Sequence, residues 1–189
     1  MAKRKKKKKP ESLFSKLRQR FKEQSPILLF CLGIVVIMIT YYWMYNQDFF
    51  NNNINKPVLK FYANVGSGLL NILGFGTTTG ESYISNPDFS LNIGKGCDAI
   101  SPTILILAAI LTFPIAFKLK IRGLIIAPVA IMLLNLIRIA SLFLIGLYAP
   151  SLFEIMHVEI WQTVFIIFCL VGWLYWLIWA NKQQKNVVA

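Results

Sequence analysis

Charged side chains are almost absent from four long stretches of this sequence. Acidic residues are scarce along the whole chain, with eight Asp and Glu against twenty Lys and Arg, and there is a single histidine. No internal repeat is present, and a chain of 189 residues has the size of one domain. Apolar stretches of this length, so poor in charge, exclude an ordinary soluble domain and indicate a membrane protein.

The four apolar stretches have the length of membrane-spanning helices. Each contains roughly 18–25 residues, enough for a helix to cross a hydrocarbon core of about 30 Å. They are Pro26–Tyr45, Ala99–Phe117, Leu124–Tyr148 and Val158–Ala180. We therefore predict an all-α integral membrane protein, with a bundle of about four transmembrane helices in residues 26–180. A basic N-terminal tail (1–25) and a short C-terminal tail (181–189) flank this domain.

Most of the basic residues fall on one side of the predicted bundle. With four spans, the two tails and the loop between the second and third spans share a side, and they hold sixteen of the twenty Lys and Arg. The positive-inside rule places this side, with both termini, in the cytoplasm. We interpret the net charge of +12 as an orientation signal and an attraction to the anionic lipid bilayer. Nucleic acid is not expected as a partner, because runs of like charge are weak motifs.

Residues 46–96 form the sizeable segment predicted outside the membrane on the other side. It opens with an asparagine-rich polar linker (51–55), followed by apolar residues at helical spacing from Val58 to Phe75. This pattern predicts an amphipathic helix lying at the membrane interface. Further along, alternation in Phe89–Ile93 after a turn sequence predicts a small β-hairpin with Ser82–Ser85.

The second spanning helix carries its own start and stop signals. Ser101 is followed by Pro102, a pairing typical of an N-cap and the first helical position. Pro114 predicts a kink near the other end of the same helix. Cys97 therefore precedes a helix N-terminus, a position that favours the thiolate form of a cysteine.

Arg138 is a permanent cation inside the third spanning stretch. Burying such a charge in hydrocarbon costs at least about 2.5–3.5 kcal/mol, so an arginine at this depth is a candidate functional residue. The third span runs outward, which places Arg138 roughly 21 Å along it from Leu124, in the outer half of the membrane. Cys97 and His157 are expected at the outer ends of the second and fourth spans. Three reactive residues from three spans thus approach one layer.

These three residues have complementary chemistry. A cysteine and a histidine can act as nucleophile and general base, and an adjacent cation can stabilise a thiolate or an oxyanion. Gly96 allows the backbone beside Cys97 to approach a substrate closely, and Asn135 extends the polar stripe of Arg138 by one turn. A structural interpretation stays open, in which Arg138 only forms an ion pair with Glu154 or Glu159. Cys31 and Cys169 are interpreted as apolar packing residues.

The order and spacing of these residues resemble those of the exosortase/archaeosortase family of membrane-embedded cysteine transpeptidases. The shared motifs are Gly96-Cys97, Asn135-Leu136-Ile137-Arg138 and His157, and the likeness covers roughly Gly96 to Trp179. The small four-span form looks most like the exosortase F branch. The family often shows Gly-Cys-x-Gly, whereas this chain has Asp98 and Ala99 after the cysteine.

The resemblance implies a peptidase of the bacterial plasma (inner) membrane, with its active site facing outside. It would cleave the C-terminal sorting signal of an exported protein through a thioester on Cys97, which an acceptor amine, a hydroxyl or water then resolves. His157 would move protons and Arg138 would stabilise negative charge, with Gly96 and Asn135 in support. No metal or organic cofactor is implied. Two alternatives remain: a non-catalytic membrane subunit, and a small transporter that uses Arg138 to bind an anionic ligand.

Overall fold

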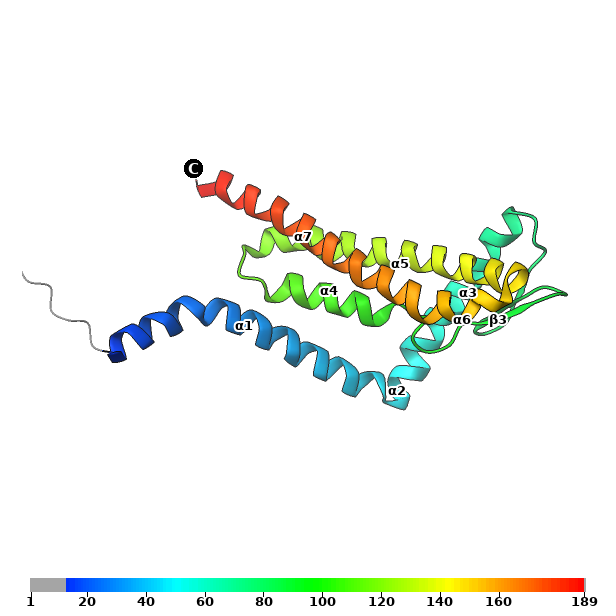
Figure 1. Cartoon of the computed structure of the whole chain (residues 1–189), viewed down its shortest axis with the longest axis horizontal. Helices are drawn as coiled ribbons and strands as arrows, with labels where there is room; N and C mark the ends of the chain where they lie inside the picture. Colours follow the sequence, from blue (N-terminus) through cyan, green and yellow to red (C-terminus); the bar gives the residue numbers. More distant parts are fainter. Residues whose placement is uncertain (1–12, 189) are drawn as a thin grey trace, which may run out of the picture.

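The computed structural model describes the backbone of residues 13–188 and the side chains of residues 25–185. The basic run at Lys3–Lys9 therefore lies outside the described residues. Four long or medium helices form the bundle: α1 (Leu13–Tyr45), α4 (Ile100–Thr112), α5 (Phe117–Tyr148) and α7 (Trp161–Val188). The described chain ends lie at one end of this bundle (Figure 1). We refer to the opposite end as the distal end.

The predicted all-α membrane bundle is confirmed, with one correction to the number of full spans. Within residues 13–188, three helical stretches are long and apolar enough to cross a membrane: Ser25–Tyr45, Phe117–Tyr148 and Pro150–Lys185. The fourth, α4, has 13 residues and rises only about 20 Å. It stops because Phe113 adopts an extended conformation (φ −65°, ψ 134°), as a residue before proline prefers. Pro114 thus ends the helix instead of kinking it.

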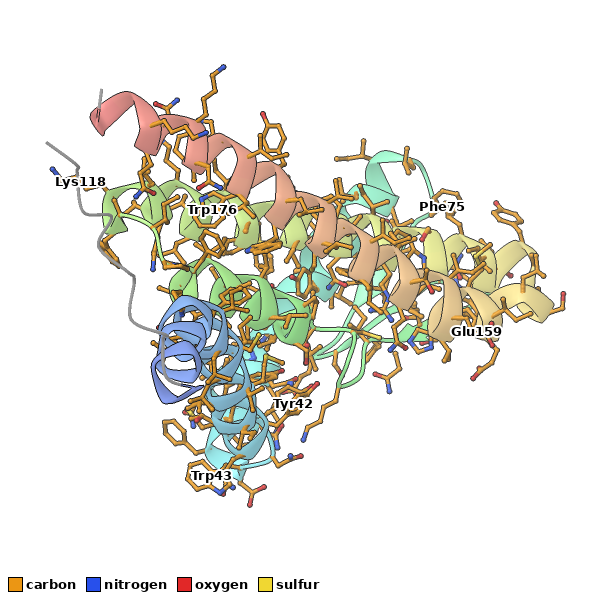
Figure 2. The ribbon with its side chains drawn as sticks, turned by 60° about the vertical axis from the view of Figure 1, so that its left-hand side comes forward. Tyr42, Trp43, Phe75, Lys118, Glu159 and Trp176 are labelled. Atoms are coloured by element: carbon orange, nitrogen blue, oxygen red, sulfur yellow. The ribbon has the colours of Figure 1, made fainter. Side chains whose placement is uncertain are left out.

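The short helix α4 lies in the centre of the bundle and packs against α1, α5 and α7 (Figure 1). Its buried residues Ile106 and Ile110 share an apolar cluster with side chains of α5 and α7. Trp176 closes this cluster between α5 and α7 (Figure 2), and its indole nitrogen donates a 3.3 Å hydrogen bond to the carbonyl of Leu119. Gly123 leaves the space for that ring, because a Cβ atom there would lie 2.6 Å from the indole nitrogen.

The asparagine-rich segment is helical and not the linker predicted from its polarity. A short helix α2 (Asp48–Phe50) runs into a π-helical turn, η1 (Asn51–Asn55), and then into α3 (Lys56–Ile72). The amide of Asn53 donates to the carbonyl of Phe49, and Asn55 is buried with a partner elsewhere in the fold. Side chains that bond back to the backbone or to a distant acceptor let asparagines remain in a helix.

Helix α3 confirms the predicted amphipathic pattern, but it ends at Ile72 rather than Phe75. Gly74 has φ +89°, and the amides of Gly74 and Phe75 bond back to carbonyls of the last turn, which stops the helix. One face of α3 packs on α5 in a second apolar cluster that includes Leu70 and Phe143. The apolar face of α3 is therefore buried against α5, and this packing accounts for the amphipathic pattern without contact with a membrane interface.

The predicted hairpin is present and is extended by a third strand. Strands β1 (Thr78–Thr79), β2 (Tyr83–Ser85) and β3 (Ser90–Asn92) form an antiparallel sheet in that order. Ile84 pairs with Leu91, and both are buried in the cluster shared with α3 and α5. The ring of Phe89 lies so close to Gly146 that a Cβ atom there would meet it at 2.1 Å. The sheet is thereby fixed on the distal part of α5.

Candidate active site

Cys97 and His157 lie in contact at the distal end of the bundle. The Sγ atom of Cys97 is 3.2 Å from Nε2 of His157, although 60 residues separate them in sequence. Cys97 is in the loop between β3 and α4, and His157 is in a π-helical turn, η3 (Met156–Ile160). The imidazole stacks on the ring of Phe153, with centroids 5.7 Å apart. A cysteine and a histidine at this distance can exchange a proton.

His157 does not lie just before the start of a helix, although the fourth apolar stretch begins at Val158. It lies inside a continuous helical stretch that comprises η2 (Pro150–Leu152), α6 (Phe153–Ile155), η3 and α7. Such π-helical turns inside helices are frequent at functional sites. Because the turn is π-helical, it changes the direction in which the imidazole leaves the helix relative to an α-helical turn.

The loop that carries Cys97 is held through its own backbone carbonyls. Gly96 adopts φ +89°, a left-handed conformation that glycine accepts without strain. The carbonyl of Cys97 accepts a 2.8 Å hydrogen bond from the amide of Asn135, and that of Gly96 accepts a longer one (3.4 Å) from Arg138. Residues Asn135 and Arg138 of α5 thus fix the two peptide groups around the thiol.

Arg138 joins the cysteine loop to the histidine turn. The side chain is 8% exposed, and besides Gly96 it donates to the carbonyl of His157 at 3.3 Å. Its guanidinium also lies over the ring of Phe165. Among the described residues, its hydrogen bonds go to carbonyl oxygens and none goes to a carboxylate, while the Nε atom is buried without a partner. The guanidinium can therefore still bind a negatively charged group.

The proposed ion pairs of Arg138 are not formed. Glu154 and Glu159 are both exposed, and Glu159 lies at the surface of the distal end (Figure 2). Neither carboxylate forms an ion pair with the guanidinium, whose hydrogen bonds go to carbonyl oxygens. The interpretation of Arg138 as half of a structural ion pair with either residue is therefore wrong.

Asp98, the residue after the cysteine, has a role that the sequence did not reveal. Its carboxylate is 2% exposed and accepts three hydrogen bonds: from the Tyr45 hydroxyl (2.6 Å), the Asn55 amide (2.9 Å) and the Ile100 backbone (2.9 Å). The last of these satisfies the backbone N–H of Ile100, the first residue of α4, whose N-cap position is Ala99. The predicted N-cap, Ser101, lies instead inside the first turn and shares a 2.8 Å hydrogen bond with Tyr41.

The pKa of the Cys97 thiol is raised, contrary to the prediction from its position before a helix. Burial of the sulfur is the main cause, because a thiolate loses hydration in an apolar site. The Arg138 cation lowers the pKa and the Asp98 carboxylate raises it, but both effects are smaller than that of burial. The thiol thus requires a base, and His157 is in contact with it.

Two cavities meet at Cys97, Arg138 and His157, which line both. The first, which we call the distal cavity, has a volume of about 400 Å³ and lies between β3 and the distal part of α5 and α6. The second, which we call the membrane groove, has a volume of about 810 Å³. Its walls are α1 and α7 and its floor is α4. Apolar side chains line it, among them Ile34, Met38, Leu105, Ala109, Ile166 and Leu170.

In the described part of the chain, no group of three or more His, Cys, Asp or Glu side chains could hold a metal ion. Cys31 is exposed and Cys169 is buried in the apolar cluster of α4 and α7, away from the cysteine loop. What the site offers chemically is therefore a thiol, an imidazole and an unneutralised guanidinium at the junction of two cavities.

Comparison with known protein families places the chain in one of them. The family model of transmembrane exosortases matches residues 24–176, which is more than half of the chain. The match includes the cysteine loop, the distal part of α5 and His157. No match was found among curated proteins. No solved structure matches the chain either.

Proposed function

We propose that this chain, which belongs to the transmembrane exosortase family, is a cysteine transpeptidase that cleaves C-terminal sorting signals of exported proteins. Within the family we assign it to the exosortase F branch, on its small size and compact form. The observation that carries the proposed activity is the 3.2 Å contact between the Cys97 thiol and the His157 imidazole beside an unpaired guanidinium.

The reaction begins with proton transfer from Cys97 to His157. The thiolate attacks the scissile carbonyl carbon, and a C–S bond forms as the carbonyl π electrons move to oxygen. When the oxyanion collapses, the C–N bond breaks and the imidazolium gives its proton to the departing amine. This leaves a thioester on Cys97. An acceptor amine, a hydroxyl or water attacks the thioester, with His157 as the base, and the thiol is restored.

Arg138 stabilises the negative charge that develops during both steps. A donor at the site of developing charge accelerates such reactions most when water is excluded, and Arg138 is buried. Its Nε atom has no partner among the described residues and is a candidate donor to the thiolate or the oxyanion. Asn135 and Gly96 act through the loop: the amide of Asn135 holds the Cys97 carbonyl, and Gly96 permits the turn.

The membrane groove fits the apolar tail that follows the scissile bond. It extends from Tyr42 to Phe30 along α1, a rise of about 18 Å, or some three helical turns. At its inner end the rings of Phe30 and Trp173 stack with centroids 6.0 Å apart. A groove that is apolar and closed by aromatic rings suits a hydrophobic tail, whereas a transporter of anions needs a polar path through the membrane.

In this proposal the protein lies in the bacterial plasma membrane with both termini in the cytoplasm. The basic residues Lys118, Lys120 and Arg122 lie at the end of the bundle opposite Cys97, which supports an active site that faces outside. The bilayer and an exported protein with a C-terminal apolar tail are its partners. The alternative of a non-catalytic subunit does not account for the contact between the thiol and the imidazole.

The proposal is tested by comparing exported proteins in cells that carry the wild-type chain or the Cys97→Ala variant. Mass spectrometry of their C-termini is expected to show precursors that keep an apolar tail in Cys97→Ala cells and lose it in wild-type cells. Cys31→Ala is the matched control, because Cys31 is an exposed cysteine of α1 that lines neither cavity. Identical C-termini in wild-type and Cys97→Ala cells would exclude the peptidase function.

A further inference from the structure

Strand β3 presents its edge to the distal cavity. Five consecutive residues, Phe89 to Ile93, line this cavity. Successive side chains of a strand point to opposite faces of its sheet, so a cavity on one face contacts every second residue. Contact with five in a row means that the cavity meets the strand along its edge. Because the sheet order is β1-β2-β3, this edge is the one that faces away from β2.

The peptide groups on this edge are those of Ser90 and Asn92. The amide of Ile93 bonds to the carbonyl of Ser82, and that of Asn86 bonds to the carbonyl of Phe89. In an antiparallel pair, hydrogen-bonded and non-bonded pairs alternate along the strands. The backbone N–H and C=O groups of residues 89, 91 and 93 therefore point toward β2. Those of Ser90 and Asn92 point away from it, and they bond to no other backbone group among the described residues.

This edge leads directly to the reactive thiol. After Asn92 the chain passes through Ile93 and turns at residues 94–97, where the Cys97 amide bonds to the Gly94 carbonyl. The cavity that contacts the edge is also lined by Cys97, Arg138 and His157. The face of β3 is used elsewhere, because Leu91 and Ile93 are buried against α5. A segment that pairs with the edge thus needs no movement of the core.

We infer that the substrate segment preceding the scissile bond binds as an added strand on the free edge of β3. Main-chain hydrogen bonds to Ser90 and Asn92 hold it, as in other cases where a peptide extends a sheet. Its direction is parallel to β3, because its last carbonyl must reach Cys97 beyond the C-terminal end of that strand. The inference rests on the proposed function, in which the tail after the bond occupies the membrane groove.

Such a mode predicts which features of the substrate matter. Backbone pairing is independent of side chains. We therefore expect the edge to select the segment before the scissile bond mainly for its ability to adopt an extended conformation. Alternate residues of that segment face the cavity wall, which includes Leu142 and Phe153. A segment with helical structure up to the scissile bond does not fit the edge.

Proline substitution tests the edge, because proline lacks the backbone N–H and is tolerated on edge strands. The precursor to follow is the one that accumulates in Cys97→Ala cells. In cells that carry Asn92→Pro, we expect this precursor to lose its tail about tenfold more slowly than in wild-type cells. Thr79→Pro is the matched control. By the same alternation Thr79 turns its N–H away from β2, but on the opposite edge of the sheet. Processing by Thr79→Pro is expected to stay within about twofold of wild type.

A second measurement does not depend on catalysis or on the fold of the proline variants. A photo-crosslinking amino acid at Asn92 in the Cys97→Ala chain is expected to capture the precursor, and one at Thr79 is not. Equal capture at both positions, or wild-type processing by Asn92→Pro, overturns the edge-binding inference while the peptidase function stands. If no precursor accumulates in Cys97→Ala cells, the proposed function fails and this inference fails with it.

Discussion

The hydroxyl of Tyr45 and the carboxylate of Asp98 are joined by a 2.6 Å hydrogen bond across 53 residues of sequence. The same phenol oxygen accepts a 3.2 Å hydrogen bond from the amide of Gly96. Tyr45 therefore holds the residues on both sides of Cys97 from the last turn of α1. The distance between the thiol and His157 thus depends on a helix that contributes neither of them.

Removing the Tyr45 hydroxyl should loosen the cysteine loop. In Tyr45→Phe, the buried Asp98 carboxylate loses one of its three donors, which we expect to destabilise the fold by about 2 kcal/mol. Thermal unfolding of the detergent-solubilised protein measures the loss, and tail processing should slow in parallel. Tyr175→Phe is the control, since Tyr175 is 76% exposed on α7 and lines neither cavity. Equal unfolding temperatures for the two variants would contradict this role.

The pH dependence of Cys97 alkylation should reflect its raised pKa. The thiolate is the reactive form, so burial leaves less of it at neutral pH, and the rate should keep rising above pH of about 8.5, where an exposed cysteine levels off. Arg138→Gln removes a cation that favours the thiolate and should move the profile to still higher pH. A charged alkylating reagent added to intact cells measures both profiles.

Arg122→Gln provides the control for this experiment. Arg122 lies over the ring of Trp179 at the other end of the bundle, and its loss should leave the Cys97 profile unchanged. A profile for Arg138→Gln that coincides with wild type would mean that the guanidinium does not act on the thiol. A wild-type profile that levels off below pH of about 8.5 would mean that burial is not the main influence.

Ala99 should tolerate glycine and reject a β-branched residue. It has φ 55°, a left-handed conformation that costs a residue with a Cβ atom of order 1–3 kcal/mol and is worst for branched side chains. We expect Ala99→Gly to fold and process normally and Ala99→Val to lose stability. Ala108→Val controls for added bulk, because Ala108 is also fully buried but lies within α4. An equal loss in both valine variants would assign the effect to packing alone.

Filling the membrane groove should block the tail without disturbing the thiol. Ala109 lies on the groove floor, and Ala109→Trp should slow tail processing by tenfold or more, on the order expected for a lost apolar site. Alkylation of Cys97 by a small reagent should persist, which separates this effect from unfolding. Leu111→Trp, at an exposed position of the same helix, is the control. Normal processing by Ala109→Trp would contradict the proposal that the tail binds in the membrane groove.

The sequence allowed the helices, the hairpin and the proximity of Cys97, Arg138 and His157 to be predicted. These features follow from local patterns: apolar length defines a span, alternation defines a strand, and the order of spans sets the end of the bundle at which each residue lies. The likeness carried by Gly96-Cys97 and by Asn135 and Arg138 agrees with the family match. The catalytic roles and the orientation in the membrane stay predictions.

The remaining features depend on contacts between distant residues. Nothing near Asp98 in the sequence shows that Tyr45 and Asn55 donate to it, so the burial and hydrogen bonding of its carboxylate could not be predicted. Asn51–Asn55 look like a linker because their composition is polar, yet they form a helical turn in which Asn55 donates to the distant Asp98 carboxylate. The dominance of burial over the helix terminus at Cys97 likewise requires knowledge of what surrounds the sulfur.

The shortness of α4 determines the depth at which the proposed reaction would take place. Its 13 residues rise about 10 Å less than the thickness of a hydrocarbon core, so one or both of its connecting loops dip below the membrane boundary. Irregular backbone is tolerated there only when protein surrounds it, and Cys97, Asp98 and Ala99 are all buried. In the proposed reaction we therefore expect the cleaved peptide bond to be set by its distance from the bilayer centre, so that a tail that is too long or too short presents the wrong bond.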